Sequence, residues 1–226
     1  MTEFQCSRFS GAGVDCARGG RLVFAALDFA VEPGCALVLV GPNGSGKSSL
    51  LRLMAGLIRP TAGALAWGDE EILKDRESHA GRTHYVGHQE AAKPAMTARE
   101  TLGFWAAMRG APGTGVERAL EVIGLGHRMD YPGRYLSSGQ KRRLALARLL
   151  AAPAPLWLLD EPSVGLDRDG VAMLERELAA HCERGGVVVL ATHTEIALGS
   201  NAVELELGDF TPSREAVLAR MAGEVV

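Results

Sequence analysis

Residues 41–48, GPNGSGKS, combine glycine, lysine and serine at a spacing that suits phosphate binding. The glycines let the backbone wrap closely around an anion, so that successive N–H groups and the N-terminus of a following helix point at its oxygens. Lys47 would reach the β- and γ-phosphates of a nucleotide, and the Ser48 hydroxyl would bind Mg²⁺, a cation that prefers oxygen ligands. The expected phosphate-binding residues are Gly41, Pro42, Asn43, Gly44, Ser45, Gly46, Lys47, Ser48 and Ser49.

Two carboxylates follow an apolar run in the segment LWLLDEP, residues 156–162. Ligands bind at the carboxyl ends of parallel strands, so Asp160 should lie beside the phosphate loop and hold Mg²⁺, directly or through water. Glu161 would be the general base that orients or deprotonates an attacking water, a role worth about 10²–10⁴-fold in rate. Taken alone, the pattern fits an ordinary acidic strand end, and only its combination with the phosphate loop favours catalysis.

His193 follows another apolar run, in the segment LATHTE. At the end of a core strand it could contact the γ-phosphate and hold the water and Glu161 in line, because phosphoryl transfer depends chiefly on positioning and electrostatics. A lone histidine is more often a surface residue. Its place downstream of both phosphate motifs favours the catalytic role.

Three short apolar runs would position these groups, at residues 35–41, 156–160 and 186–192. Each is apolar on both alternating faces, which is typical of central strands in a parallel sheet that helices cover on both sides. A helix is expected from about Lys47 to Leu57, and another from near Asp167 to the RGG at 184–186. This alternation predicts an α/β fold, and the loop of residues 41–48 between an expected strand and an expected helix predicts a P-loop NTPase core.

The remaining segments predict additions to this core. RLVFAALDFAVEPG, residues 21–34, alternates in a way that suits N-terminal antiparallel strands. The middle, from about 90 to 152, has helical patterns without strong strands, and TARE at 97–100 is a capping box. We expect one domain over residues 1–226 with this region as an inserted helical lobe.

Composition excludes several classes of protein. The net charge of −3 offers no bulk attraction to nucleic acid, so no nucleic-acid partner is expected. The four cysteines form no CxxC pair, which suits reduced thiols rather than a disulfide framework or a zinc site. The N-terminus lacks a signal pattern, and the longest apolar stretch, 149–159, is broken by prolines and falls short of the ~20 residues that span a bilayer.

The motifs together resemble the ATP-binding subunits of ABC transporters. They occur in that family's order along nearly the whole chain: the P-loop, YVGHQ, LSSGQ, LWLLDEP, VGLD and ATH. The resemblance implies hydrolysis of ATP with Mg²⁺ by a homodimer whose subunits pack head to tail. Each LSSGQ segment would then close on the ATP that the other subunit holds.

The resemblance also assigns residues. The signature segment is Leu136, Ser137, Ser138, Gly139 and Gln140, with a helix expected to begin near Gln140. Its free N–H groups and hydroxyls would clamp a γ-phosphate, although a simple N-cap fits the same residues. Gln89 matches the glutamine that senses Mg²⁺ and the attacking water. Asp167 matches an acidic residue in the dimer contact, and a helix N-cap is its equally good local role.

Two positions depart from the family pattern. Ser138 stands where the family commonly has glycine, which adds a hydroxyl close to the phosphate. Arg18 stands where an aromatic residue usually stacks on adenine. A guanidinium can also stack on a base, so ATP remains the expected nucleotide.

A transport role implies separate integral membrane subunits. The helical lobe would dock them, and Met96, Leu102, Phe104, Trp105 and Met108 are candidates for either the docking surface or the lobe's core. Residues 88–105, 135–149 and 155–167 are similar to one branch, the heme-exporter ATP-binding subunits of cytochrome c biogenesis. That resemblance implies a bacterial protein peripheral to the cytoplasmic face of the inner membrane. Another small ABC transporter and a soluble ABC-type ATPase in cofactor assembly remain alternatives.

Overall fold

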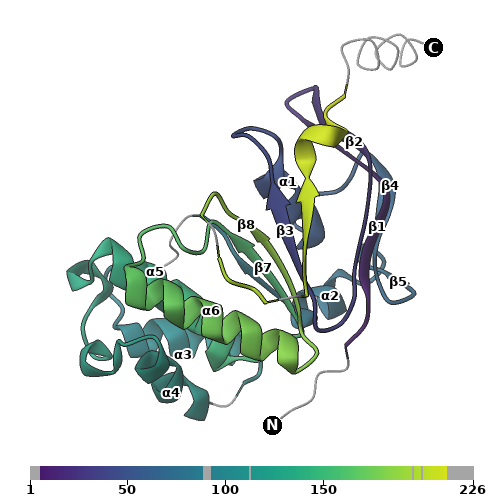
Figure 1. The fold of residues 1–226 in the computed structure, drawn as a ribbon. Coiled ribbons are helices and arrows are strands. Elements are labelled where there is room, and N and C mark those ends of the chain that lie inside the picture. Colours follow the sequence, from purple (N-terminus) through teal and green to yellow (C-terminus); the bar gives the residue numbers. More distant parts are fainter. Residues whose placement is uncertain (1–5, 89–92, 112, 195, 200, 213–226) are drawn as a thin grey trace.

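The computed structural model describes residues 6–88, 93–111, 113–194, 196–199 and 201–212. A parallel sheet forms the middle layer, with helices on one side and an antiparallel sheet on the other (Figure 1). Gln89, the predicted sensor of Mg²⁺ and water, lies outside the described residues. The predicted α/β fold with a parallel central sheet and N-terminal antiparallel strands is confirmed.

The parallel sheet has the strand order β6-β7-β8-β3-β9. Its strands are β3 Ala36–Val40, β6 Thr83–Val86, β7 Leu156–Asp160, β8 Val187–Ala191 and β9 Ala202–Glu206. The three strands expected from the apolar runs, β3, β7 and β8, are neighbours in its centre. Every residue of β7 and β8 is buried, as their apolar character on both faces predicts.

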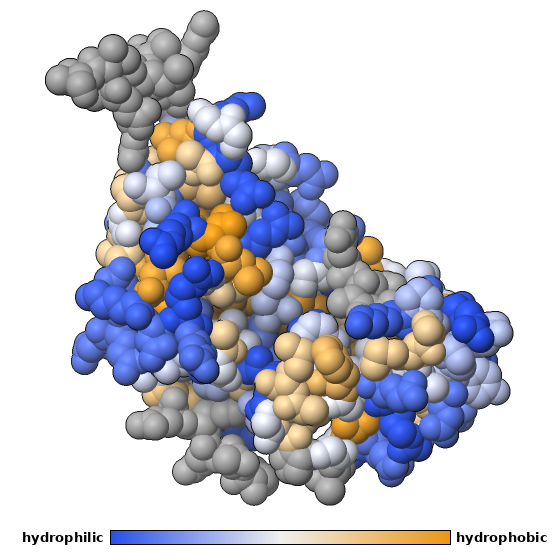
Figure 2. Space-filling model, turned by 180° about the vertical axis from the view of Figure 1, so that it is seen from behind, coloured by the Kyte–Doolittle hydropathy of each residue, from blue (hydrophilic) through white to orange (hydrophobic). Residues whose placement is uncertain are grey.

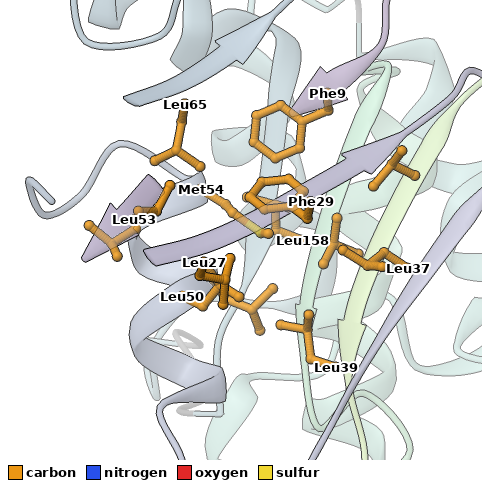
Figure 3. Packing of buried hydrophobic residues seen from close by; sticks show 14 of the residues in the cluster. Phe9, Leu27, Phe29, Leu37, Leu39, Leu50, Leu53, Met54, Leu65 and Leu158 are labelled. Atoms are coloured by element: carbon orange, nitrogen blue, oxygen red, sulfur yellow. The ribbon is translucent and has the colours of Figure 1, made fainter. Parts of the chain in front are cut away.

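Alternate residues of the central strands face two different hydrophobic clusters. Leu156 and Leu158 of β7 join a cluster with α1, Lys47–Met54, and the antiparallel sheet. Figure 3 shows this packing, with Leu50 and Met54 of α1 among side chains from both sheets. Trp157 and Leu159 instead join a cluster with α5, Ser138–Ala151, and α6, Arg168–Glu183. Helix α1 therefore lies between the sheets, and α5 and α6 cover the opposite face.

The antiparallel sheet has the order β2-β1-β4-β5. Its strands are β1 Phe9–Arg18, β2 Arg21–Val31, β4 Ala62–Trp67 and β5 Glu70–Glu71. A two-residue turn joins β1 to β2, with Gly19 at φ 56° and Gly20 at φ 76°, and it pairs Arg18 with Arg21. Positive φ at both turn residues matches the twist of a hairpin, so the turn sets Arg18 at the hairpin's tip.

Helices α3 Ala98–Met108, α4 Thr114–Val122 and α5 enclose a third hydrophobic cluster. The predicted capping box is confirmed, since Thr97 accepts from the Glu100 amide and Glu100 accepts from the Thr97 amide. Helix α2 Arg76–Arg82 precedes β6, and short 3₁₀ turns lie at Gly126–Arg128, Gly133–Tyr135 and Leu207–Phe210. The three helices form a lobe at the left of Figure 1, beside the parallel sheet.

Two helix boundaries differ from the predictions. Helix α1 ends at Met54 instead of continuing to Leu57, because Gly56 at φ 67° lets the Leu57 amide bond back to the Arg52 carbonyl. Helix α5 begins at Ser138, two residues before the predicted start at Gln140, because Ser137 and Gln140 form a second capping box. The Asp167 N-cap of α6 is found where the sequence placed that helix's start.

Candidate functional site

The loop between β3 and α1 forms one wall of a pocket of about 630 Å³. Ten residues expected in the site line it, and six of them are Arg18, Lys47, Ser48, Asp160, Glu161 and His193. They come from a β-hairpin, the start of α1, and the ends of β7 and β8. Because β3, β7 and β8 are parallel neighbours, their carboxyl ends meet at one edge of the sheet and bring these residues together.

Lys47 is buried and folded back onto its own loop. Its Nζ donates to the Gly41 carbonyl oxygen at 2.6 Å and to the Pro42 carbonyl oxygen at 3.1 Å. The Ser45 amide also donates to the Pro42 oxygen at 3.2 Å, which closes the loop into a ring. The Gly41 and Pro42 carbonyl oxygens therefore hold the Lys47 ammonium group over the loop, and oxygens of a bound phosphate could replace them as acceptors.

The same loop fits a phosphate group. Gly44 lies at φ 86°, and a Cβ built on it would meet no atom within 4 Å, so that side of the loop faces open space. The N-terminus of α1 points into the pocket, and no acidic side chain occupies its first turn. A helix N-terminus and a concave backbone attract anions. Asn43, Gly44, Gly46 and Ser49 also line the pocket.

Asp160 and Ser48 meet at the floor of the pocket. The Ser48 hydroxyl donates to Asp160 Oδ1 at 3.0 Å, and Asp160 is only 3% exposed. A hydroxyl and a carboxylate beside a phosphate loop are the oxygen donors that Mg²⁺ takes in such sites. Among the described residues, no cluster of three His, Cys, Asp or Glu side chains could hold a metal ion by itself. The pair thus fits a cation that also takes phosphate and water oxygens.

Glu161 and His193 form a pair above this floor. The His193 amide donates to Glu161 Oε2 at 3.3 Å, and His193 Nε2 lies 3.5 Å from Glu161 Oε1. The Glu161 amide donates to the Ala191 carbonyl oxygen at 2.8 Å, which continues the pairing of β7 with β8. Glu161 has a φ of 50°, a conformation that non-glycine residues rarely adopt and that surrounding contacts must hold.

Residues on the rim complete the pocket. Arg18 is exposed at the hairpin tip and lines the pocket with Val23. His88 also lines it, a residue that the sequence interpretation passed over. The sequence signal that could have identified His88 is its position in the YVGHQ motif, directly before Gln89.

A second pocket, of about 420 Å³, lies at the signature segment. Ser137, Gly139 and Gln140 line it together with Gly165, Arg143 and Asp167. The capping box engages the Ser137 and Gln140 side chains and the Gln140 amide, whereas an α-helix supplies no acceptor for the Ser138 and Gly139 amides of its first turn. Leu136 is buried in the lobe's cluster, and Ser138 is exposed as the first residue of α5.

Gly139 has no room for a side chain. A Cβ at this position would lie 2.7 Å from the Gly165 carbonyl oxygen. The loop between β7 and α6 therefore rests directly on the start of α5. This close approach explains glycine at position 139, whereas Ser138 is tolerated because its side chain is exposed.

Asp167 makes both of its local contacts on one oxygen. Its Oδ1 accepts from the Gly170 amide at 2.9 Å and pairs with Arg143 Nη2. The Gly170 amide, with the Arg143 guanidinium second, lowers the pKa of Asp167 below its usual value. Arg143 also donates to the Ile123 carbonyl oxygen at 3.2 Å. Asp167 is thus an N-cap within its own chain, and a role in a dimer contact stays a prediction.

The two pockets differ in what they can do. The P-loop pocket combines a cation, a carboxylate for Mg²⁺ and a carboxylate beside a histidine, which suits the binding and hydrolysis of a nucleoside triphosphate. The signature pocket offers amide and hydroxyl donors that can bind an anion. Val164 lines the first and Gly165 the second, so one loop touches both.

Comparison with known proteins gives the family. The family model for ABC transporters matches residues 24–164. The cytochrome c biogenesis ATP-binding export protein CcmA of Rhodospirillum rubrum is 53% identical over 211 residues, which cover 93% of this chain and 91% of that protein. The protein of the same name from Paramagnetospirillum magneticum is 51% identical over 213 residues, or 92% and 98% of the two chains.

Solved structures agree on the fold. A putative ABC transporter ATP-binding protein from Pyrococcus furiosus has a TM-score of 0.75 at 21% identity, over 91% of this chain and all of that one. An ATP-binding subunit of an ABC transporter has a TM-score of 0.79 at 21% identity, over 96% and 95% of the two chains. The family match, the close relatives and the shared fold together show that this chain belongs to the ABC transporter family.

Proposed function

We propose that this chain is the ATP-hydrolysing subunit of a membrane complex in cytochrome c biogenesis, where it drives the export or handling of heme. It would bind Mg²⁺ and ATP at the interface of a head-to-tail homodimer and lie at the cytoplasmic face of the inner membrane, attached through its partners. The convergence of Lys47, Asp160, Glu161 and His193 in one pocket carries the ATPase part. The relatives named for cytochrome c biogenesis support the biological role.

ATP binding would begin at the P-loop. Lys47 would leave the Gly41 and Pro42 carbonyl oxygens, from which it is now 2.6 and 3.1 Å, and bond to the β- and γ-phosphates. Phosphate oxygens carry negative charge and the carbonyl oxygens do not, so the Coulombic attraction between the ammonium and the phosphates favours the exchange. Arg18 at the hairpin tip would stack on the adenine.

Ser48 and Asp160 would hold Mg²⁺. Their 3.0 Å hydrogen bond shows that the two oxygens already face each other. A Mg²⁺ ion held by these two oxygens would supply positive charge beside the phosphates. Gln89, which the resemblance adds to this set, is proposed on that resemblance alone.

Glu161 would accept a proton from the attacking water. His193 lies 3.5 Å from the carboxylate through Nε2 and also donates its amide at 3.3 Å, so it fixes the direction in which Glu161 points. The same ring would contact the γ-phosphate. Positioning of this kind is the main means by which proteins accelerate phosphoryl transfer.

The signature pocket would bind the ATP held by the other subunit. Within one chain it is separate from the P-loop pocket, and it contains no carboxylate beside a histidine. Its amides and hydroxyls would stabilise the γ-phosphate from the side opposite Lys47. Closure of two copies head to tail would therefore complete two equal sites.

The membrane partners would dock on the helical lobe. Leu102 is buried in the lobe's cluster, whereas Phe104 and Met108 of α3 are 47% and 63% exposed one turn apart. No helix in the described part of the chain is long and apolar enough to cross a bilayer. Figure 2 shows hydrophilic and apolar side chains interspersed over the face opposite that of Figure 1. Because Phe104 and Met108 are both exposed on α3, they fit a local contact with a helix of a membrane partner.

Light scattering of the Glu161→Gln protein tests the ATPase part of this proposal. Mg-ATP should convert the variant from monomer to dimer and Mg-ADP should not, because only a γ-phosphate reaches both pockets. The unmodified protein should hydrolyse ATP in a reaction that depends on Glu161. A variant that stays monomeric with ATP, together with a purified membrane complex whose ATPase rate does not depend on Glu161, would contradict the composite site.

Purification from membranes tests the biological role. A tagged chain expressed in its host should co-purify with integral membrane proteins needed for the maturation of c-type cytochromes, and its deletion should abolish holocytochrome c. Recovery of an unrelated transporter instead, with normal cytochrome c, would refute the cytochrome role and leave the ATPase assignment intact.

A further inference from the structure

Arg142 occupies an unusual place for a charged residue. It lies in the first turns of α5, just after the signature segment, and is only 3% exposed. It precedes Leu146 and Leu149 by one and two turns, and both of these belong to the cluster packed against the parallel sheet. A guanidinium on this buried stripe requires hydrogen-bond acceptors.

Backbone carbonyls at the carboxyl ends of two strands supply these acceptors. Arg142 Nη2 donates to the Asp160 oxygen at 2.8 Å and to the Glu161 oxygen at 2.6 Å. Nε donates to the Pro162 oxygen at 3.3 Å, so three consecutive peptide groups bind one side chain. Nη1 donates to the Gly87 oxygen at 2.9 Å, directly after β6.

These bonds fix the backbone that carries the predicted general base. Glu161 has the rare φ of 50°, and Arg142 holds the carbonyl groups on both sides of its Cα. The direction of the Cα–Cβ bond follows from that backbone. Arg142 therefore determines where the carboxylate stands relative to His193, although it lies behind the loop and does not line the pocket.

The same side chain joins the helical lobe to the site. Its backbone belongs to α5, one turn after Ser138, while its acceptors belong to the core of the P-loop domain. Gly87 is two residues before Gln89 in the chain. A shift of α5 relative to the sheet would thus pull on the backbone of Glu161 and on the segment that leads to Gln89.

We infer that Arg142 is a positioning residue that holds Glu161 in its hydrolytic conformation and links that conformation to the start of the signature helix. This inference rests on the proposed ATPase function. Only arginine suits the role, because its planar group has five donors in a fixed fork, whereas the ammonium of lysine is a single point with three.

The test compares Arg142→Lys with the unmodified protein in the form, subunit or membrane complex, that hydrolyses ATP. We expect kcat to fall about 10- to 100-fold, the range for a displacement of roughly 1 Å in a catalytic group, while KM changes by less than about threefold. Rates are expressed per nucleotide-binding site, counted by titration, so that loss of folded protein does not lower the apparent kcat. If Arg142→Lys does not fold, Arg142→Gln takes its place.

Arg109→Lys is the matched control. Arg109 also lies in the helical lobe and donates to core carbonyls, those of Ala80, Gly81 and Thr83 at 3.3, 2.7 and 3.0 Å. Thr83 begins β6, so these contacts lie at the end of the strand away from the site. The control should keep its kcat within about twofold, because it loses similar bonds without touching Glu161.

A double-mutant cycle with Glu161→Gln separates positioning from general stability. If Arg142 acts through Glu161, then Arg142→Lys should not lower the residual single-turnover rate of the Glu161→Gln protein further. Equal losses in both backgrounds, or a wild-type kcat in Arg142→Lys, would overturn the role of Arg142 alone. An ATPase rate that does not depend on Glu161 would overturn both this inference and the proposed function.

Discussion

The P-loop pocket and the signature pocket sit in one chain but are built on different principles. The first gathers side chains from the start of α1 and from the ends of β7 and β8, including Lys47, the buried Asp160 and the paired Glu161 and His193. The second is a helix start whose own side chains are used for capping, and whose charged residues, Arg143 and Asp167, bind each other. One pocket has the means for chemistry and the other has only donors for an anion.

Under the proposed head-to-tail dimer, neither pocket is a complete site by itself, because the first supplies the chemistry and the second the donors that would close on it. The loop that links them passes from Val164 in the first to Gly165 in the second, and the Gly165 carbonyl rests on Gly139. We expect binding of ATP to depend on the first pocket and its hydrolysis to depend on both.

The largest effect should come from Glu161→Gln. Loss of the general base should lower kcat about 10²–10⁴-fold, while ATP binding, measured by fluorescence of a bound analogue, is retained. The matched control is Glu204→Gln on β9, where the side chain is exposed outside both pockets. Equal ATPase rates for the two variants would contradict the role of Glu161 as general base in the first pocket.

The next largest effect should come from Gly139→Ala. The added Cβ would lie 2.7 Å from the Gly165 oxygen and force α5 and the linking loop apart. Overpacking of this kind costs about 2 kcal/mol. If this cost falls on closure of the signature segment over ATP, we expect the ATPase rate to fall by up to roughly 30-fold. ATP affinity of the monomer should stay unchanged, which equilibrium binding would check.

Gly81→Ala is the control for that substitution. Gly81 lies in α2, and a Cβ there would meet nothing within 4 Å. Its ATPase rate should equal that of the unmodified protein. If Gly139→Ala weakens ATP binding as much as it slows hydrolysis, then ATP binding does not depend on the P-loop pocket alone.

A smaller effect concerns a region outside both pockets. His181 stacks on Trp157 with ring centroids 3.8 Å apart, and burial lowers its pKa from 6.5 to about 4. Between pH 6.5 and about 4 the unfolded state therefore binds a proton on His181 that the native state does not. The free energy of unfolding falls as the pH decreases through this range. At pH 5.5 the loss should be about 1.4 kcal/mol, and burial of His84, with its pKa lowered to about 3, acts in the same direction.

Urea unfolding at pH 7.5 and at pH 5.5 measures this effect. His181→Phe keeps an aromatic ring but cannot be protonated, so its loss of stability between the two pH values should be about 1.4 kcal/mol smaller than that of the unmodified protein. His127→Phe makes the same exchange at an exposed position and should keep the original pH dependence. A pH dependence unchanged by His181→Phe would show that the acid sensitivity arises elsewhere.

The smallest effect should come from Arg18 on the rim of the first pocket. Its guanidinium is exposed, so stacking on adenine should contribute about 0.5–1 kcal/mol, and Arg18→Ala should raise the KM for ATP by roughly threefold. Arg18→Tyr should restore the KM, since an aromatic ring stacks as well. An unchanged KM in Arg18→Ala would exclude stacking as its role.

The core and the P-loop pocket could be foreseen because their signals are local. Strands β3, β7 and β8 are apolar on both faces, and polar groups follow each of them at the same edge of the sheet. The capping box at Thr97 and the N-cap at Asp167 depend on residues within one helical turn. Such patterns fix an element without knowledge of its neighbours.

Other features depend on contacts between distant segments. The close approach of Gly165 to Gly139 and the bonds from Arg142 to three carbonyls at the carboxyl end of β7 exist only in the folded chain. Arg142 did leave a signal, as a charge on the stripe that continues through Leu146 and Leu149. The sequence signals for strands β4, β5 and β9 are weaker. These strands lie towards the edges of their sheets, and each contains exposed residues, so none is a continuous apolar run.

The composite site is tested most directly by ATP hydrolysis in an equal mixture of Lys47→Ala and Gly139→Ala proteins. In a head-to-tail dimer of the two, the intact P-loop of one chain faces the intact signature of the other, so one of two sites works. Random pairing makes about half of the dimers mixed, and we expect roughly a quarter of the unmodified rate. A mixture no more active than the average of the two variants would show that each chain's own pockets act together and would contradict the account.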